Sequence, residues 1–99
     1  MNNVQLYEML KKASKKSKRG KYQIVLHDDN HNTFDNVINC LIDACGHNEF
    51  QAHQCALIVH KTGKCIVLID SHSVCEIAYE FLLKVGLKVT LEKHVKQNP

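Results

Sequence analysis

Glycine is scarce in this chain, with four residues scattered among 99. A phosphate-binding loop needs clustered glycines, because the backbone has to approach the anion closely. Nucleophilic catalysis needs a Cys or Ser held by a base. Nothing in the sequence places such a nucleophile beside His60, the histidine that ends an apolar segment. The sequence therefore offers no argument for an enzyme, and we expect neither catalytic residues nor a cofactor.

Long apolar runs are also missing. No run approaches the ~18 residues that a membrane-spanning helix needs, and the first residues lack the apolar core of a signal peptide. Hydrophobic residues make up 44% of the chain, which is ordinary for one small globular domain. Five cysteines are an odd number for a chain without a secretion signal. We expect a reduced, cytosolic protein with no membrane partner.

The cysteines and histidines lack the close pairs, such as Cys-x2-Cys, that a zinc site needs. The nearest arrangements are Cys40-x4-Cys45-x-His47 and His53-x-Cys55-x4-His60. Cys45, Cys55 and Cys75 fall on or beside apolar helix faces, where a free cysteine behaves as a small hydrophobic residue. We therefore expect no metal, and a metal-binding domain ranks behind the two functions named below.

Charge is distributed unevenly along the chain. Residues 1–21 contain seven basic side chains and one acid, Glu8, whereas residues 22–99 contain six lysines and nine acids. Like charges repel in the basic segment and few apolar residues offset the cost of ordering it, so a mobile tail is predicted over 1–21. A nucleic-acid-binding arm has the same composition, but no aromatic residue interrupts the basic run to stack on bases.

Hydrophobic periodicity predicts an α+β fold over residues 22–94 in the order β-α-α-β-α-β, a sandwich of a small three-stranded sheet and three helices. The first helix begins at a cap at Asn32 or Thr33, and the second at an Asn48–Gln51 capping box. A Ser73–Glu76 capping box is predicted to open the third. The apolar run 65–69 predicts a central strand, and residues 95–99 are expected to fray.

Two acids and an amide (Asp28, Asp29 and Asn30) follow the first predicted strand, just before a helix begins. Such a concentration of acceptors can bind a cationic or donor-rich group. A solvated turn would use the same residues, since Asp and Asn are common turn formers. His60 also has two interpretations, because a histidine at a helix C-terminus is favoured by the helix dipole without binding anything.

Two segments, residues 28–38 and 56–65, carry a more specific signal. The first reads Asp-Asp-Asn-His-Asn-Thr-Phe-Asp-Asn-Val-Ile and resembles the Asn-Asp-Asp-x-Thr-Pro-Met-Glu-Phe-Val motif of the ClpS family. The second reads Ala-Leu-Ile-Val-His-Lys-Thr-Gly-Lys-Cys and resembles the family's Val-His-x-x-Gly-Lys motif after an apolar helix end. Both motifs occur in the family's order and spacing, and the similarity continues to about Lys93.

The resemblance implies the ClpS fold, which is similar to the C-terminal domain of the bacterial ribosomal stalk protein. It also implies a non-enzymatic adaptor of the N-end rule. Such an adaptor recognises substrate proteins with destabilising, bulky apolar N-terminal residues (N-degrons). It delivers them to a Clp AAA+ unfoldase, of the ClpA or ClpC type, with its peptidase. In this family the N-terminal tail, here residues 1–21, is the mobile segment that the unfoldase engages.

Carried over by motif position, the resemblance implies a two-part binding site. The α-ammonium group of the substrate would be bound by Asp28, Asp29, Asn30 and His60. The first side chain of the substrate would enter an apolar pocket walled by Leu26, Asn32, Phe34, Val37, Ala56 and Val59.

Several site residues depart from the family pattern. Asp28 replaces Asn, which adds a negative charge opposite the ammonium but cannot donate to a peptide carbonyl, and Asn30 replaces Asp. Phe34 replaces the Met that gates the pocket, and Ala56 stands where many members have Met. A larger gate therefore faces a smaller wall.

The unfoldase-binding surface of many family members includes an acid and a lysine around the third predicted helix. Here Ser73 and Ala78 stand at those two positions, and Glu76 matches an acidic position nearby. We expect Glu76 and Ser73 to contribute to this contact. The alternative function is a ribosome- or nucleic-acid-associated module acting through residues 1–21, whereas the resemblance implies no nucleic-acid partner.

Overall fold

The computed structural model describes residues 2–16 and 21–95. Its elements follow in the order α1 (Asn3–Lys16), β1 (Tyr22–His27), α2 (Phe34–Cys45), α3 (Glu49–Thr62), β2 (Lys64–Asp70), α4 (His72–Lys84) and β3 (Val89–Lys93). None of the helices in the described ranges is long and apolar enough to cross a membrane. Residues 17–20, in the predicted tail, and 96–99, in the predicted frayed end, lie outside the described residues.

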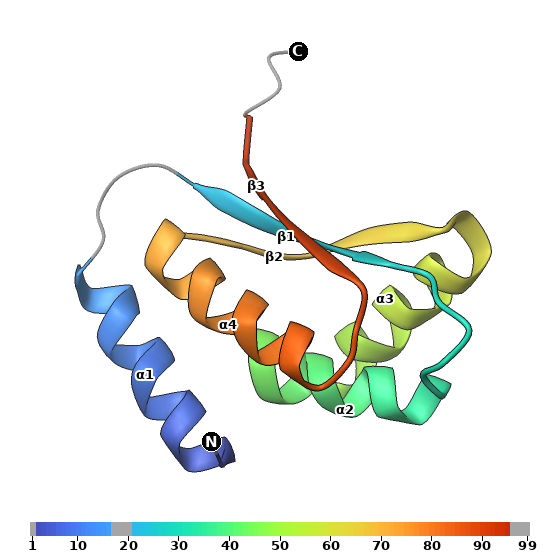
Figure 1. The fold of residues 1–99 in the computed structure, drawn as a ribbon, viewed down its shortest axis with the longest axis horizontal. Helices are drawn as coiled ribbons and strands as arrows, with labels where there is room; N and C mark the ends of the chain where they lie inside the picture. The colour runs from blue at the N-terminus through green and yellow to red at the C-terminus, as the bar shows by residue number, and fades with distance from the viewer. Residues whose placement is uncertain (1, 17–20, 96–99) are drawn as a thin grey trace.

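The three strands form one antiparallel sheet in the order β2-β1-β3. Figure 1 shows the helices together on one side of this sheet, so that its other side is uncovered. Side chains alternate between the faces of a strand, and Ile24 and Leu26 of β1 are 0% and 1% exposed beneath the helices. This arrangement confirms the predicted α+β fold, with a fourth helix added before it.

The starts of α2 and α3 confirm the predicted caps. The Thr33 hydroxyl accepts a hydrogen bond from the backbone N–H of Asn36 at 3.1 Å. The Asn48 and Gln51 side chains each accept from the other's backbone N–H, which completes a capping box. These local bonds satisfy donors that a helix start leaves without intrahelical partners.

The prediction of a mobile tail was wrong for residues 3–16, which form helix α1. Leu6 is 0% exposed and Ala13 is 6% exposed, and Leu10 packs against the same core. These residues are spaced four and three apart, so they share one helix face, and α1 packs against α4 and α2. Charge density predicted the tail, but the burial of this narrow apolar stripe offsets the cost of ordering the segment.

The prediction of a central strand at residues 65–69 was also wrong, because β2 lies at an edge of the sheet. Val67 is 4% exposed, whereas Ile66 and Ile69 are both 45% exposed. They pair with Val25 and Gln23 of β1, with a shift of register between the two pairs, so both lie on the uncovered side. An unbroken apolar run is typical of a strand covered on both faces. Here only one face is covered.

The cap of α4 is Ser71 rather than the predicted Ser73. The Ser71 hydroxyl accepts from the N–H of Val74 at 3.3 Å, and Ser71 itself is buried. Glu76 does not complete a capping box. Instead, its Oε2 atom lies 3.5 Å from Nε2 of His72, and both side chains are half exposed. Ser71 and Ser73 carry the same capping signal in the sequence. Ser71 caps the helix because β2 ends at Asp70, directly before it.

Candidate functional site

The polar loop after β1 is attached to two helix ends by backbone carbonyls. The N–H of Asp28 donates to the carbonyl of Gly63 at 2.9 Å, and the Asn32 amide donates to the carbonyl of Gly86 at 2.9 Å. Gly63 and Gly86 have φ angles of 96° and 92°, a left-handed conformation that glycine adopts without a steric penalty. The loop is therefore held between the C-terminal end of α3 and the turn from α4 to β3.

The Asp29 carboxylate accepts hydrogen bonds from other residues of the same loop. One of its carboxylate oxygens accepts from the N–H groups of His31 and Asn32, at 2.8 and 2.9 Å, and the other accepts from the Asn32 amide at 3.1 Å. Burial acts to raise the pKa of Asp29, but these three hydrogen bonds and the nearby His31 together lower that pKa below its ordinary value. Asp29 is thus held in its charged form as part of the loop.

Replacing Asp29 by Ala should lower the free energy of unfolding by about 1–2 kcal/mol at pH 7, because hydrogen bonds to a charged acceptor are lost. A group with a lowered folded-state pKa stabilises the protein above its unfolded pKa, ~3.9 for Asp, and loses that effect as the pH falls through the folded value. The difference between parent and variant should therefore shrink from pH 5 to pH 2.5 in urea titrations.

Asp28→Ala is the matched control for this prediction, because the Asp28 side chain has no hydrogen-bond or ionic partner within the described residues. Its unfolding free energy should stay within about 0.5 kcal/mol of the parent at every pH. A difference between Asp29→Ala and the parent that does not vary with pH would contradict the role of the charge.

The loop and one face of α3 enclose a pocket of about 300 Å³. Its lining residues are all among those that the sequence singled out, namely Asp28, Asp29, Asn30, Asn32, Phe34, Ala56 and His60. Ala56 and His60 are four residues apart on α3, so both face the loop. The structure thus brings together two motifs that are separated by 17 residues, which form the rest of α2, the turn after it and the first half of α3.

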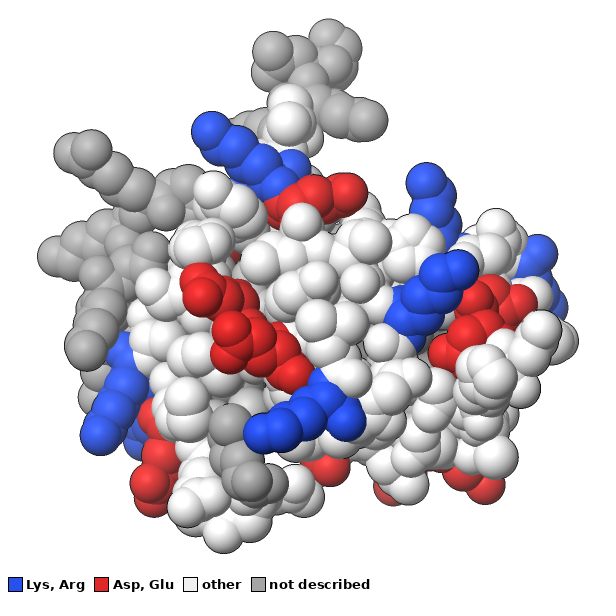
Figure 2. Space-filling view, in the orientation of Figure 1, with Lys and Arg blue, Asp and Glu red and all other residues white. Residues whose placement is uncertain are grey.

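Three of the lining side chains keep unused hydrogen-bonding groups. The side chains of Asp28, Asn30 and His60 have no hydrogen-bond or ionic partner in the described part of the chain. Of the residues that the structure describes, two carboxylates and no Lys or Arg line the pocket. Figure 2 shows acidic atoms at the end of the molecule where Figure 1 places the loop after β1. The pocket is suited to a cationic group that can donate several hydrogen bonds.

The apolar side of the pocket is formed by Phe34 and Ala56. The Phe34 ring is 37% exposed and makes an edge contact with His53 of α3, with 5.3 Å between the ring centroids. The other predicted wall residues do not line the pocket: Leu26 and Val59 are buried in the core, and Val37 packs against that core.

Glu76 and Ser73 lie elsewhere, in the first turns of α4 directly after the end of β2. Both side chains are exposed. The pocket adjoins the start of β2, which is seven residues long, so roughly 20 Å of strand separates the two places. A contact at Glu76 and Ser73 would leave the pocket accessible.

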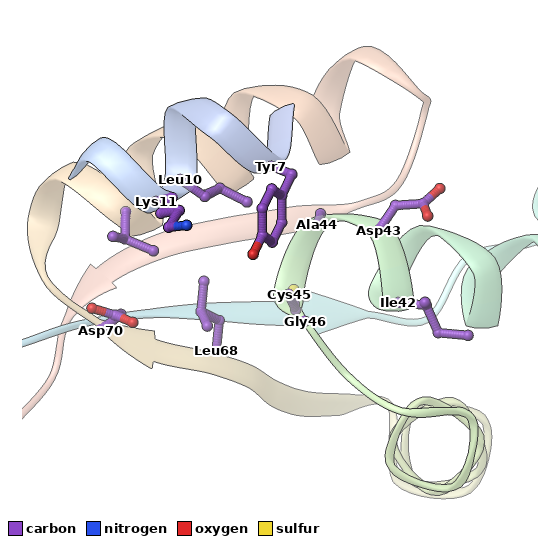
Figure 3. A pocket seen from close by; sticks show the side chains of 11 residues that line it. Tyr7, Leu10, Lys11, Ile42, Asp43, Ala44, Cys45, Gly46, Leu68 and Asp70 are labelled. Carbon is purple, nitrogen blue, oxygen red and sulfur yellow. The ribbon is translucent and has the colours of Figure 1, made fainter. Parts of the chain in front are cut away.

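A second pocket, of about 330 Å³, lies beneath α1 and is shown in Figure 3. Tyr7, Leu10 and Lys11 of α1 face Leu68 and Asp70 of β2 across it. It contains none of the residues that the sequence singled out as a binding site. It lies at the Asp70 end of β2, opposite the end that adjoins His60.

All five cysteines are free thiols, and each is buried or half-buried. Within the described ranges, no three His, Cys, Asp or Glu side chains are placed to hold a metal ion. Burial raises the pKa of Cys45 and of Cys55 to about 12. A thiol with so high a pKa stays protonated at neutral pH and is a poor nucleophile and a poor ligand.

Sequence reasoning missed three participants in this region. His53 contacts Phe34, and its spacing of three from Ala56 and seven from His60 on one helix face could have indicated it. The carbonyls of Gly63 and Gly86 also hold the loop. No local pattern connects Asn32 with Gly86, which lie 54 residues apart.

Known proteins share this fold. The solved structure of Agrobacterium tumefaciens ClpS2 bound to L-phenylalaninamide is similar, with a TM-score of 0.65, 17% sequence identity, and coverage of 78% of this chain and 100% of that chain. No curated protein matches the sequence.

The family is shown by the sequence itself. Residues 10–90 match the model of the family described as ATP-dependent Clp protease adaptor protein ClpS. The match covers most of the chain and includes both motifs, so the chain belongs to the ClpS family of Clp protease adaptors.

Proposed function

We propose that this protein is an N-degron receptor: it binds the free N-terminus of proteins that begin with a bulky apolar residue and delivers them to a Clp AAA+ unfoldase with its peptidase. The observation that carries the proposal is the pocket in which the unpaired acceptors of Asp28, Asn30 and His60 stand beside the apolar surface of Phe34 and Ala56. Membership of the adaptor family supports it. So does the ligand of the similar ClpS2 structure, an amino acid amide with a free amino group and an apolar side chain.

The two parts of the pocket select for a chain terminus. Asp28, Asn30 and His60 would accept hydrogen bonds from the α-ammonium, with Asp29 holding the loop in shape. Only a free N-terminus presents an ammonium and a side chain on the same carbon, so internal segments are rejected. Charge-assisted hydrogen bonds contribute ~1.5–3 kcal/mol each, and burying the side chain adds ~1.5–3 kcal/mol. We expect micromolar affinity, about −8 kcal/mol.

Delivery needs a second surface and a segment that the unfoldase can grip. We assign the unfoldase contact to Glu76 and Ser73, exposed at the start of α4, and the gripped segment to residues 1–21. The partner would be a cytosolic unfoldase of the ClpA or ClpC type. No chemical step is assigned to the adaptor itself.

The proposal is tested by measuring the affinity of short peptides that differ only in their first residue. Peptides beginning with Phe, Leu, Tyr or Trp should bind at micromolar concentrations, and matched peptides beginning with Ser or Glu should bind at least about tenfold more weakly, because they bury no large apolar side chain. Equal binding of the whole set would overturn the proposal. Capture of nucleic acid that weakens steeply with salt would instead favour the ribosome- or nucleic-acid-associated alternative.

The size of the Phe34 ring should restrict which first residues enter. Phe34→Ala should admit peptides beginning with β-branched Val or Ile, which the parent excludes, because the gate opposite the small Ala56 is then removed. We expect their affinity to rise by about tenfold, the equivalent of ~1.4 kcal/mol. An unchanged preference in the same peptide titrations would mean that Phe34 is not a gate.

A further inference from the structure

The Phe34 ring does not lie in the hydrophobic core, although it belongs to the first turn of α2. It is 37% exposed, lines the pocket, and meets the ring of His53 edge to face, with an angle of 80° between the ring planes. Such an arrangement is favourable for aromatic pairs. His53 itself is exposed on α3.

The placement of His53 on α3 relates this contact to the pocket. His53, Ala56 and His60 are spaced three and four apart, so they follow one face of the helix. At 1.5 Å per residue, His53 lies ~10 Å along the helix axis from His60. Ala56 lies between them, and its methyl group leaves space for the Phe34 ring to reach His53. The polar end of the pocket is therefore at His60, and its apolar end is at Phe34, whose ring contacts His53 outside the lining.

We propose that His53 is a specificity-determining residue of this site: its ring fixes the orientation of Phe34 and thereby sets which first side chains the pocket accepts. The inference rests on the proposed function. It deepens that function, because the residue that orients the Phe34 gate lies outside both motifs. His53 is a positioning residue, because it acts through Phe34.

A double-mutant cycle tests the inference. The quantity measured is the ratio of the Kd for a peptide beginning with Val to the Kd for the same peptide beginning with Phe. His53→Ala should lower this ratio by about three- to tenfold, the range expected for loss of an aromatic pair. In the Phe34→Ala background, His53→Ala should change the ratio less than about 1.5-fold, because the ring that it positions is already absent.

Two further variants separate positioning from helix structure. His53→Phe keeps a ring at this place and should retain the parental ratio. Gln54→Ala, at an exposed neighbouring position on α3, should also retain it. A parent protein that binds no free N-terminus would overturn the proposed function. A parent that binds, with a ratio that His53→Ala leaves unchanged or changes equally in both backgrounds, would overturn this inference alone.

Discussion

Acetylating the α-amino group of a peptide that begins with Phe or Leu should lower its affinity by about 100-fold or more, because at least two charge-assisted hydrogen bonds of ~1.5–3 kcal/mol each are lost. Acetylation removes the positive charge and two donors while leaving the side chain unchanged. The acceptors of Asp28, Asn30 and His60, which have no partners within the described residues, would then face a neutral amide. Isothermal titration of free and acetylated peptides measures the difference.

Variants of the protein test whether the effect of acetylation comes from contacts in the pocket. Asp28→Ala and His60→Ala should each weaken binding of the free peptide by about tenfold. Both should have a smaller effect on the acetylated peptide. His31→Ala is the matched control, since His31 belongs to the same loop but does not line the pocket. Equal affinity for free and acetylated peptides would show that the ammonium group is not recognised.

Deleting residues 1–20 should abolish delivery of a degradable substrate while leaving peptide affinity within about twofold, a change smaller than ~0.5 kcal/mol. The deletion removes the segment that we assign to the unfoldase. Among the described side chains, none from α1 lines the pocket that contains His60. The deletion also removes α1 from one wall of the second pocket (Figure 3). Peptide titration and a degradation assay with the Clp machinery measure the two properties separately.

The deletion also removes buried side chains. A loss of delivery could therefore come from lower stability rather than from removal of the segment that the unfoldase grips. Leu6→Ala serves this purpose, because it removes a fully buried side chain without shortening the chain. It should cost about 2–5 kcal/mol of stability and retain delivery. If Leu6→Ala prevents delivery as completely as the deletion does, delivery requires α1 docked on the fold, and the idea that the unfoldase grips a free segment is contradicted. Weaker peptide binding after the deletion would place residues 1–20 in the site.

Local patterns in the sequence determined much of this protein. The caps at Thr33 and Asn48 follow from hydrogen bonds between residues three apart, which a sequence displays directly. The order of strands and helices follows from hydrophobic periodicity. Seven of the ten residues that the sequence predicted for the candidate site line the pocket, whereas Leu26, Val37 and Val59 do not.

Only the tertiary structure decided how these pieces meet. The density of positive charge in residues 1–21 predicted a mobile tail rather than a docked helix. The burial of Leu6 depends on the packing of α1 against α4 and α2, which the sequence does not display. An apolar run could not reveal that β2 is an edge strand, because exposure depends on which face the helices cover. The loop that carries Asp28 is held by the carbonyls of Gly63 and Gly86. Hydrogen bonds between residues so far apart in the chain depend on how the helices pack on one face of the sheet.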